Sequence, residues 1–196
     1  MVGKLRIAAL TVLLSLILFG CGGLRYSQVT PEAKDFHPKN IGILPIDVST
    51  SEEAKGVIDK IVADELVDKG WFSSVVSTEM FHQRMASDDD IKKTVLDYSS
   101  KLKTVSYSDP DLSKKIGEQF KIDAFLVIDI DYWNYTVIND KKLAKVEASV
   151  QMIDANTGKL CWKARHHVIK DYLLLKPALS DVARNLVDTM ISEMPH

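Results

Sequence analysis

Two aspartates in an apolar stretch are the first residues whose type and spacing could support chemistry. Asp129 and Asp131 follow the apolar run AFLVI at 124–128. Side chains two residues apart on a β-strand project from the same face, so both carboxyl groups would lie on one side of a sheet. Two carboxyl groups can share the acid and base roles of a hydrolase. No other residue completes a catalytic site around them, so we expect no enzyme and keep a hydrolase using this pair only as an alternative.

Charged residues on the neighbouring predicted strands favour a simpler role for the two aspartates. Lys145 and Glu147 belong to one such strand, and Lys163 and Arg165 belong to the next. Opposite charges that face each other across paired strands are common on the solvated face of a sheet. We therefore expect a polar sheet face with ion pairs.

The histidines and glycines do not form a site for a metal or a cofactor. His166 and His167 are adjacent, so on a strand they point to opposite faces, and His37 and His82 lie in unrelated segments. A metal site needs several converging ligands. The sequence also lacks a glycine-rich phosphate loop, and we expect neither a metal nor a cofactor.

One cysteine of the predicted domain is a candidate reactive thiol. Alternation places Cys161 on the polar strand face beside Lys163 and Arg165, and positive neighbours lower the pKa of a thiol. A nucleophile would still need a base, and no histidine is placed to serve as one. We expect a passive thiol, or one that a partner covers.

Aromatic residues gather on the same strands. Tyr132, Trp133, Tyr135 and Trp162 could be core residues, or they could form a partly exposed strip at a protein interface, where Tyr and Trp are enriched. Both interpretations stay open from the sequence. The candidate interface residues are Tyr132, Trp133, Tyr135, Lys145, Cys161, Lys163 and Arg165.

The amino terminus has the build of a secretory signal peptide. Lys4 and Arg6 are followed by an apolar stretch at 7–19 and by a small residue, Gly20, before Cys21. Such a charged start, apolar middle and small residue are typical of a cleaved leader. The stretch is shorter than the ~20 apolar residues that a spanning helix needs.

The end of this leader, Leu18-Phe19-Gly20-Cys21, resembles the lipobox that lipoprotein signal peptidase recognises. The resemblance implies diacylglyceryl transfer to the Cys21 thiol, cleavage before it, and acylation of the new amino group. Several acyl chains on one residue give stable anchoring. In Gram-negative lipoproteins, an Asp directly after the lipidated Cys resembles a retention signal for the inner membrane. Residue 22 is Gly, so the resemblance implies the periplasmic face of the outer membrane rather than the inner membrane or a single cell membrane.

Composition excludes several classes for the chain that follows. Removal of 1–20 leaves 176 residues and a formal charge of −4, because the leader takes two of the 25 basic and none of the 27 acidic residues. Nucleic-acid binding demands a basic face, so we expect no nucleic-acid partner. With Cys21 lipidated, Cys161 has no partner within the chain, and the fold must rely on its apolar core.

The pattern along the chain predicts a short tether at 21–38 and one domain at 39–196. A strand at 40–47, an amphipathic helix that a capping box at Thr50 and Glu53 opens, and a strand at 71–77 predict a parallel βαβ unit. Helices at 78–104 and 110–120 follow. The later elements are strands at 124–137, 143–153 and 160–168 and a closing helix after Pro177.

These elements predict an α/β fold with α+β character. We expect a mixed sheet with a parallel βαβ start, an antiparallel three-stranded meander and helices packed on one face. The other face of the meander is expected to be polar, because Lys145, Glu147 and Gln151 alternate with apolar residues.

Several motifs resemble periplasmic lipoproteins related to the curli-secretion lipoprotein CsgG and to LpoB, an activator of a penicillin-binding protein. They are the strand IGILPID at 41–47, KIDAFLVIDIDYW at 121–133 and VQMIDANTGKLCW at 150–162. The likeness is greatest to an uncharacterised branch of lipoproteins in that group. It implies an α/β domain like the amino-terminal domain of TolB, with no catalytic residues to transfer.

From these observations we expect a membrane-anchored bacterial envelope lipoprotein that acts as a non-enzymatic interaction or assembly module in the periplasm. The lipid on Cys21 would hold it to the membrane, and another envelope protein would be its partner. A subunit of an oligomeric secretion or assembly ring, and hence a homo-oligomer, is the alternative.

Overall fold

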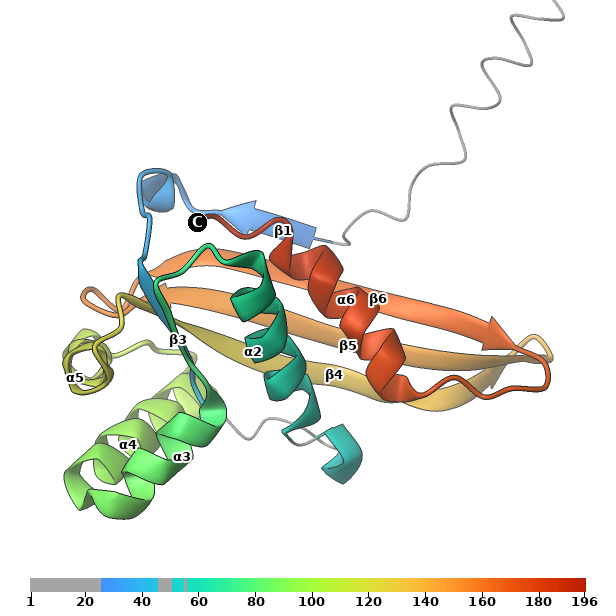
Figure 1. Ribbon diagram of the computed structural model, residues 1–196, viewed down its shortest axis with the longest axis horizontal. Helices are drawn as coiled ribbons and strands as arrows, with labels where there is room; N and C mark the ends of the chain where they lie inside the picture. The colour runs from blue at the N-terminus through green and yellow to red at the C-terminus, as the bar shows by residue number, and fades with distance from the viewer. Residues whose placement is uncertain (1–25, 46–50, 55) are drawn as a thin grey trace, which may run out of the picture.

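The computed structural model describes residues 26–45, 51–54 and 56–196. Its centre is one six-stranded mixed sheet with the strand order β1-β6-β5-β4-β2-β3 (Figure 1). The predicted signal peptide at 1–20 and the predicted lipidation site, Cys21, lie outside the described residues. The strands are β1 (Tyr26–Val29), β2 (Asn40–Ile43), β3 (Ser74–Val76), β4 (Ala124–Ile138), β5 (Lys141–Asp154) and β6 (Leu160–Tyr172).

The parallel start of the sheet is confirmed. Strand β2 pairs in parallel with β3 on one side and with β4 on the other, so Ile41 lies between Val75 and Ala124. Helix α2 (Val57–Lys69) connects β2 to β3. Space beside Gly42 in the middle of β2 is small, because a Cβ there would meet Ile122 Cδ1 at 2.7 Å and the Phe81 ring at 3.1 Å.

The antiparallel meander of β4, β5 and β6 is also confirmed. Asn139 and Asp140 make the first turn with positive φ angles of 50° and 63°, which two-residue hairpin turns require. Two irregularities interrupt the pairing, one between Ile130 and Tyr132 and one opposite Met152 and Ile153. Each leaves one residue, Asp131 or Cys161, as the extra residue of a β-bulge.

The sheet begins earlier in the chain than predicted. Within the segment expected to be a tether, Tyr26–Val29 forms edge strand β1, which pairs antiparallel with β6. The 3₁₀ turn η1 (Pro31–Ala33) follows, and Ala33 is buried. Trp162 Nε1 donates a hydrogen bond of 3.0 Å to Ser27 Oγ. The tether is therefore shorter than 21–38, because the chain already pairs with the last strand from Tyr26 onward.

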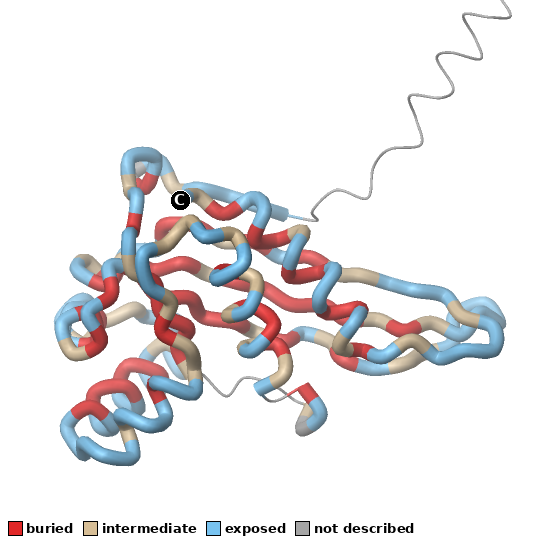
Figure 2. The backbone as a smooth tube through the Cα atoms, viewed as in Figure 1, coloured by how far each residue is buried: buried red, intermediate tan, exposed pale blue. Residues whose placement is uncertain are grey.

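The larger core lies between one face of the sheet and helices α2 and α6 (Leu179–Ile191) (Figure 2). The alternation predicted for β5 is confirmed, since Ala144, Val146, Ala148, Val150 and Met152 all point into this core. Helix α6 contributes the apolar stripe that helical spacing predicts. Its buried residues are Leu179, Val182, Ala183, Leu186, Val187, Met190 and Ile191.

Helix α2 begins later than the sequence suggested. The short 3₁₀ turn η2 (Glu52–Ala54) precedes it, and Gly56 with φ of 68° occupies the position before Val57. Thr50, the predicted first residue of the capping box, lies outside the described residues. The buried stripe of Ile58, Ile61, Val62 and Leu66 agrees with the prediction.

A second core covers part of the opposite face, so helices pack on both faces and not on one. Phe125 and Val127 of β4 point into it, because alternate residues of a strand face opposite sides. The helices on this side are α3 (Thr78–Ser87), α4 (Asp89–Val105) and α5 (Pro110–Phe120).

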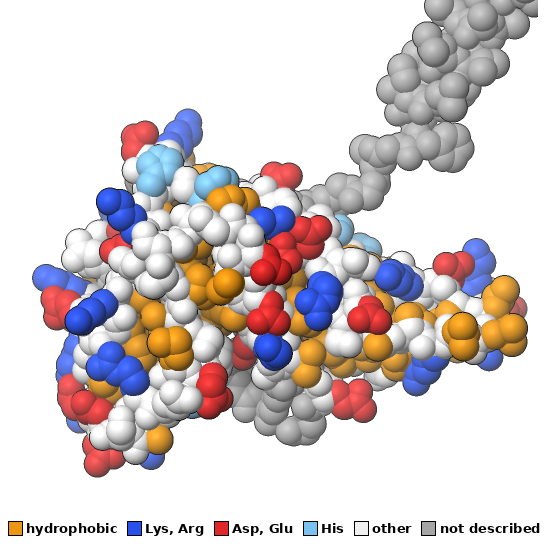
Figure 3. All heavy atoms as spheres, in the orientation of Figure 1, with side chains coloured by type: hydrophobic (Ala, Val, Ile, Leu, Met, Phe, Trp, Pro, Cys, Tyr) orange, Lys and Arg blue, Asp and Glu red, His pale blue; other side chains and the backbone are white. Residues whose placement is uncertain are grey.

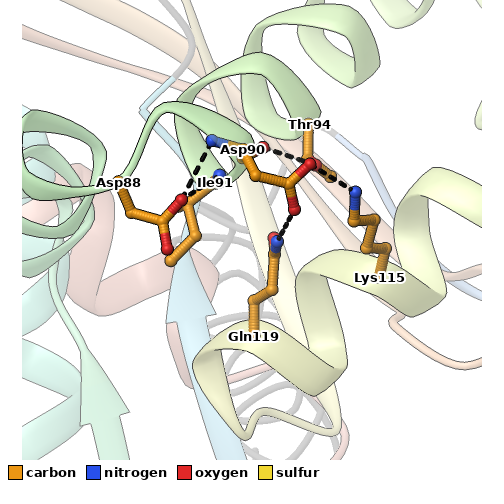
Figure 4. Close-up of polar contacts among 6 residues, drawn as sticks. All are labelled: Asp88, Asp90, Ile91, Thr94, Lys115 and Gln119. Atoms are coloured by element: carbon orange, nitrogen blue, oxygen red, sulfur yellow. Dashed lines mark hydrogen bonds and ion pairs between the residues drawn. The ribbon is translucent and has the colours of Figure 1, made fainter.

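Acidic residues fix the start of α4 and its contact with α5 (Figure 4). The Asp88 carboxylate accepts hydrogen bonds from the backbone N–H groups of Asp90 and Ile91, as an N-cap residue does. The Asp90 side chain accepts hydrogen bonds from Lys115 at 2.9 Å and from Gln119 at 3.1 Å. Asp109 caps α5 in the same way as Asp88 caps α4, as the Asp-Pro pair predicted.

Candidate functional site

The candidate site is the face of the meander that points away from α2 and α6. We call it the polar meander face and define it by Asp129, Asp131, Tyr132, Lys145, Glu147, Lys163 and Arg165. Pairing brings these residues together from three strands, since Tyr132 lies opposite Glu147 and Ser149 lies opposite Arg165. The sequence analysis placed the six charged residues on this face, and the structure agrees. It left Tyr132 open between the core and an interface.

A chain of ion pairs runs across this face. Lys145 Nζ lies 2.8 Å from Glu147 Oε2, and Arg165 Nη2 lies 3.0 Å from Glu147 Oε1. Arg165 Nε also approaches Asp131 Oδ2 at 3.3 Å. One guanidinium therefore bridges carboxylates of two strands, and the planar fork of arginine suits that geometry.

The network holds the Glu147 carboxylate in its charged form. The hydrogen bond from Lys145, together with the guanidinium of Arg165, lowers the pKa of Glu147 against the opposing effect of burial. Only 6% of Glu147 is exposed. The ammonium of Lys145 also lies 4.8 Å from the centre of the Tyr132 ring, a cation–π distance. This part of the face is thus a rigid pattern of fixed charges.

The bulge at Asp131 makes this arrangement possible. An extra residue shifts the alternation of β4, so that Asp131 bonds Arg165 while its neighbour Tyr132 also lies opposite Glu147. In a regular strand two consecutive side chains would point to opposite faces. The bulge therefore adds an aromatic ring to the charged surface.

Asp129 occupies a different setting, a cavity of about 480 Å³ between the sheet and the end of α4. The pKa of Asp129 is raised, mainly by burial and to a smaller extent by the charge of Asp131. The charges of Lys163 and Lys103 act in the opposite direction. The cavity has room for a small polar ligand or for part of a partner. Its lining residues are Leu102, Lys103, Ser106, Val127, Asp129, Gln151 and Lys163.

The two aspartates share a face as predicted, but their settings differ. Asp131 is paired with Arg165, whereas Asp129 lines the cavity. Sequence reasoning missed the contribution of Lys103, near the end of α4, and of Ser106, which follows that helix. Both precede β4 in the chain and carry no local signal of the cavity. The polar position of Gln151 in the β5 alternation was the available clue.

The predicted placement of Cys161 on the polar face is wrong. The residue is only 4% exposed and belongs to the larger core, because the bulge changes the direction of its side chain. Burial raises the pKa of its thiol to about 11. The lysine and arginine side chains therefore do not lower the pKa of this thiol, which is a core group.

The aromatic residues do not form one strip. Trp162 and Trp133 are buried in the larger core, and Tyr135 packs against that core, whereas Tyr132 lies on the opposite face. The Tyr135 hydroxyl donates a hydrogen bond of 2.8 Å to the carbonyl of Pro177. Of the three tyrosine and tryptophan residues proposed for an interface on β4, only Tyr132 lies on the polar meander face.

The described residues contain no group of three or more His, Cys, Asp or Glu side chains that could hold a metal ion. His166 is buried, and burial lowers its pKa, with a smaller effect from His167. In the part of the chain that the structure describes, no helix has the length and hydrophobicity to cross a membrane.

Comparison with solved structures finds a similar fold in PelC from Paraburkholderia phytofirmans. A PelC dodecamer aligns with a TM-score of 0.52 and 14% identity over 86% of this chain and 94% of that chain. A second dodecamer, of a PelC variant, aligns with a TM-score of 0.50 and 15% identity over 79% and 86% of the two chains. At these identities the likeness concerns the fold alone.

Lipoprotein GNA1162 from Neisseria meningitidis aligns with a TM-score of 0.49 and 13% identity, over 79% of this chain and 98% of that chain. A score at this level supports no statement about function. No protein-family model matches the chain, and no curated protein matches it.

Proposed function

We propose that this chain is a bacterial envelope lipoprotein, tethered by lipid on Cys21, that acts as a non-enzymatic interaction or assembly module in the periplasm. The leader and lipobox at the amino terminus support the tether. Gly22 supports the outer membrane as its location. The partner is another envelope protein that docks on the polar meander face.

The observation that carries the interaction role is the ion-pair chain of Lys145, Glu147 and Arg165. Its carboxylate is fixed in the charged state, which suits recognition of a complementary surface better than proton transfer. Arg165 and Tyr132 are also residue types that often dominate binding energy at protein interfaces. Contacts with neighbouring strands already hold these side chains in place. They would therefore lose little conformational freedom when a partner binds.

A homo-oligomeric ring is the second candidate. The fold likeness to PelC supports it, because the PelC chains form a dodecamer. The motifs that resemble the CsgG and LpoB group favour the same alternative, since the curli-secretion relative is also an oligomer. In that case the docking partner of the polar meander face would be a second copy of the chain.

A photo-crosslinking residue in place of Asn134 tests both candidates in native membranes. Asn134 is exposed and lies opposite Lys145 on the polar meander face. Lys93, exposed on α4, is the matched control position. An adduct with one other envelope protein from position 134 only would support the module, and an adduct of two copies would support the ring. Absence of any adduct specific to position 134 would contradict both.

A further inference from the structure

The far end of the meander exposes a group of apolar side chains. We call it the leucine tip, and it is the end of the sheet that extends beyond the helices (Figure 1). Pairing of Lys142 with Val137 and with Tyr172 brings the β4–β5 turn next to the end of β6. The members and their exposed fractions are Val137 65%, Ile138 51%, Ile169 44%, Leu173 90%, Leu174 94% and Leu175 90%.

Three consecutive leucines at this exposure make no contribution to the core of the described chain. They follow β6 and precede α6, and all residues of 173–176 are exposed (Figure 2). Hydrophobic side chains are visible at the same end of the molecule in Figure 3. A contiguous exposed apolar patch marks a surface that binds something apolar.

Positive charge surrounds the leucine tip. Lys141 and Lys142 lie in the hairpin, Lys170 lies near the end of β6, and Lys176 follows the leucines. The segments 137–142 and 169–176 contain these four lysines and two acidic residues, Asp140 and Asp171, so the tip carries a formal charge of +2. Apolar side chains with flanking lysines suit the boundary between acyl chains and anionic headgroups.

The direction of β1 places the predicted anchor toward the same end. Because β1 is antiparallel to β6, with Tyr26 opposite Arg165, its first residue is the one nearest the leucine tip. Leu173 lies eight residues beyond Arg165, which is about 26 Å along a strand. Cys21 precedes Tyr26 by five residues, a reach of at most about 18 Å.

With the five residues before Tyr26 extended toward the tip, Leu173 would lie about 8 Å beyond Cys21. Interfacial apolar groups enter a bilayer to a depth of ~5–10 Å, which matches this offset. Both the lipid on Cys21 and the leucine tip can therefore meet one membrane surface. A second copy of the chain suits the tip less well, because a tip-to-tip contact would bring the lysines of both copies together.

We propose that the leucine tip enters the interfacial layer of the membrane that carries the lipid anchor, with its lysines against anionic headgroups. The tip would give the tethered domain a second membrane contact and a defined orientation. Placement beside the anchor rests on the proposed lipidation, whereas the binding of the tip to lipid does not.

Vesicle binding of the chain that starts at residue 21 and carries Cys21→Ser tests the tip without the lipid. Vesicles of phosphatidylethanolamine with phosphatidylglycerol are compared with vesicles of phosphatidylcholine. We expect binding to the anionic vesicles, weaker binding to the neutral ones, and a loss of about tenfold or more when Leu173, Leu174 and Leu175 are all replaced by Ser.

A second measurement reports whether the tip itself enters the bilayer. In a Leu174→Trp chain, lipids brominated on the acyl chain should quench tryptophan fluorescence more than they do in the parent chain. The matched control is Leu96→Trp, at an exposed leucine on α4, and it should not be quenched.

Three outcomes would overturn the proposal. They are absence of binding to anionic vesicles, equal binding by the triple serine variant, and equal quenching at positions 174 and 96. If the triple serine variant forms a smaller oligomer in solution than the parent chain, and its vesicle binding is unchanged, the tip would instead contact a second copy of the chain. Mass spectrometry of the native amino terminus tests the anchor separately, so failure of the tip and failure of the anchor can be told apart.

Discussion

Truncation of two leucines in different settings tests whether the leucine tip is external to the core. Leu186 on α6 is 0% exposed and packs in the larger core, whereas Leu175 is 90% exposed. The change Leu→Ala removes the same atoms in both cases. The change leaves a cavity only at Leu186, because the hydrogen-bonded sheet under α6 cannot shift to fill the space.

Buried Leu→Ala changes cost ~2–5 kcal/mol, and we expect about 3 kcal/mol for Leu186→Ala. For a chain of this size that is a fall in Tm of roughly 6–12 °C. Leu175→Ala should change the free energy of unfolding by less than about 0.5 kcal/mol, as exposed substitutions do. Urea unfolding followed by tryptophan fluorescence measures both, because Trp162 and Trp133 are buried in the same core.

A loss at Leu175 comparable to that at Leu186 would refute the reasoning. It would mean that the tip packs against the folded chain and contributes to its stability. The proposed membrane contact would then lose its basis. A negligible effect at Leu186 would contradict the assignment of α6 to the core.

Three further predictions concern the polar meander face and the sheet. Lys145, followed by Arg165, lowers the pKa of Glu147. The charged carboxylate therefore adds to the free energy of unfolding above the ordinary glutamate pKa, and this contribution is lost as the pH falls through the lowered pKa. Urea unfolding from neutral to acid pH should therefore show the difference between the parent chain and Glu147→Gln shrinking, and a constant difference would contradict the ion pairs. Gly42→Ala should cost about 1–3 kcal/mol by overpacking, because its Cβ would meet the buried Phe81 ring at 3.1 Å as well as Ile122 Cδ1 at 2.7 Å. Denaturant midpoints measure this, and an unchanged midpoint would show that the two side chains move aside freely. Burial raises the pKa of Cys161 to about 11, so in a Cys21→Ser chain its thiol should react with Ellman's reagent at pH 8 only after unfolding, and rapid reaction in the folded chain would show that it is accessible.

The sequence predicted those parts of the fold that local patterns determine. Alternation along β5 identified which residues enter the core. The Asp109-Pro110 pair identified the start of α5. The parallel β2–β3 pair followed from a strand, a helix and a strand in succession. In each case the pattern spans only a few residues and reports directly on burial or capping.

The two bulges explain most errors at the candidate site. A bulge depends on how two strands pair, and it reverses the alternation on which prediction of side-chain direction relies. Cys161 moved from the polar face into the core for this reason. At Asp131 the bulge turned Trp133 and Tyr135 toward the larger core and brought Tyr132 to the polar face.

Long-range pairing accounts for the remaining differences. Strand β1 is short, fully exposed and weakly patterned, and its partner strand lies more than a hundred residues away in the chain. The second core had a local signal, since the run AFLVI at 124–128 is apolar on both faces, and such a strand needs cover on both sides. That signal indicates helices on both faces of the sheet, whereas the prediction placed them on one face only.

Mass spectrometry of the natural protein, extracted from its own membranes, tests the central claim most directly. If the chain is a tethered envelope lipoprotein, its first residue is Cys21 and this residue carries a diacylglyceryl group on the sulfur, with an acyl group on the amino nitrogen in an organism that completes the modification. A chain that begins at another residue, or one whose Cys21 bears no lipid, would contradict the claim.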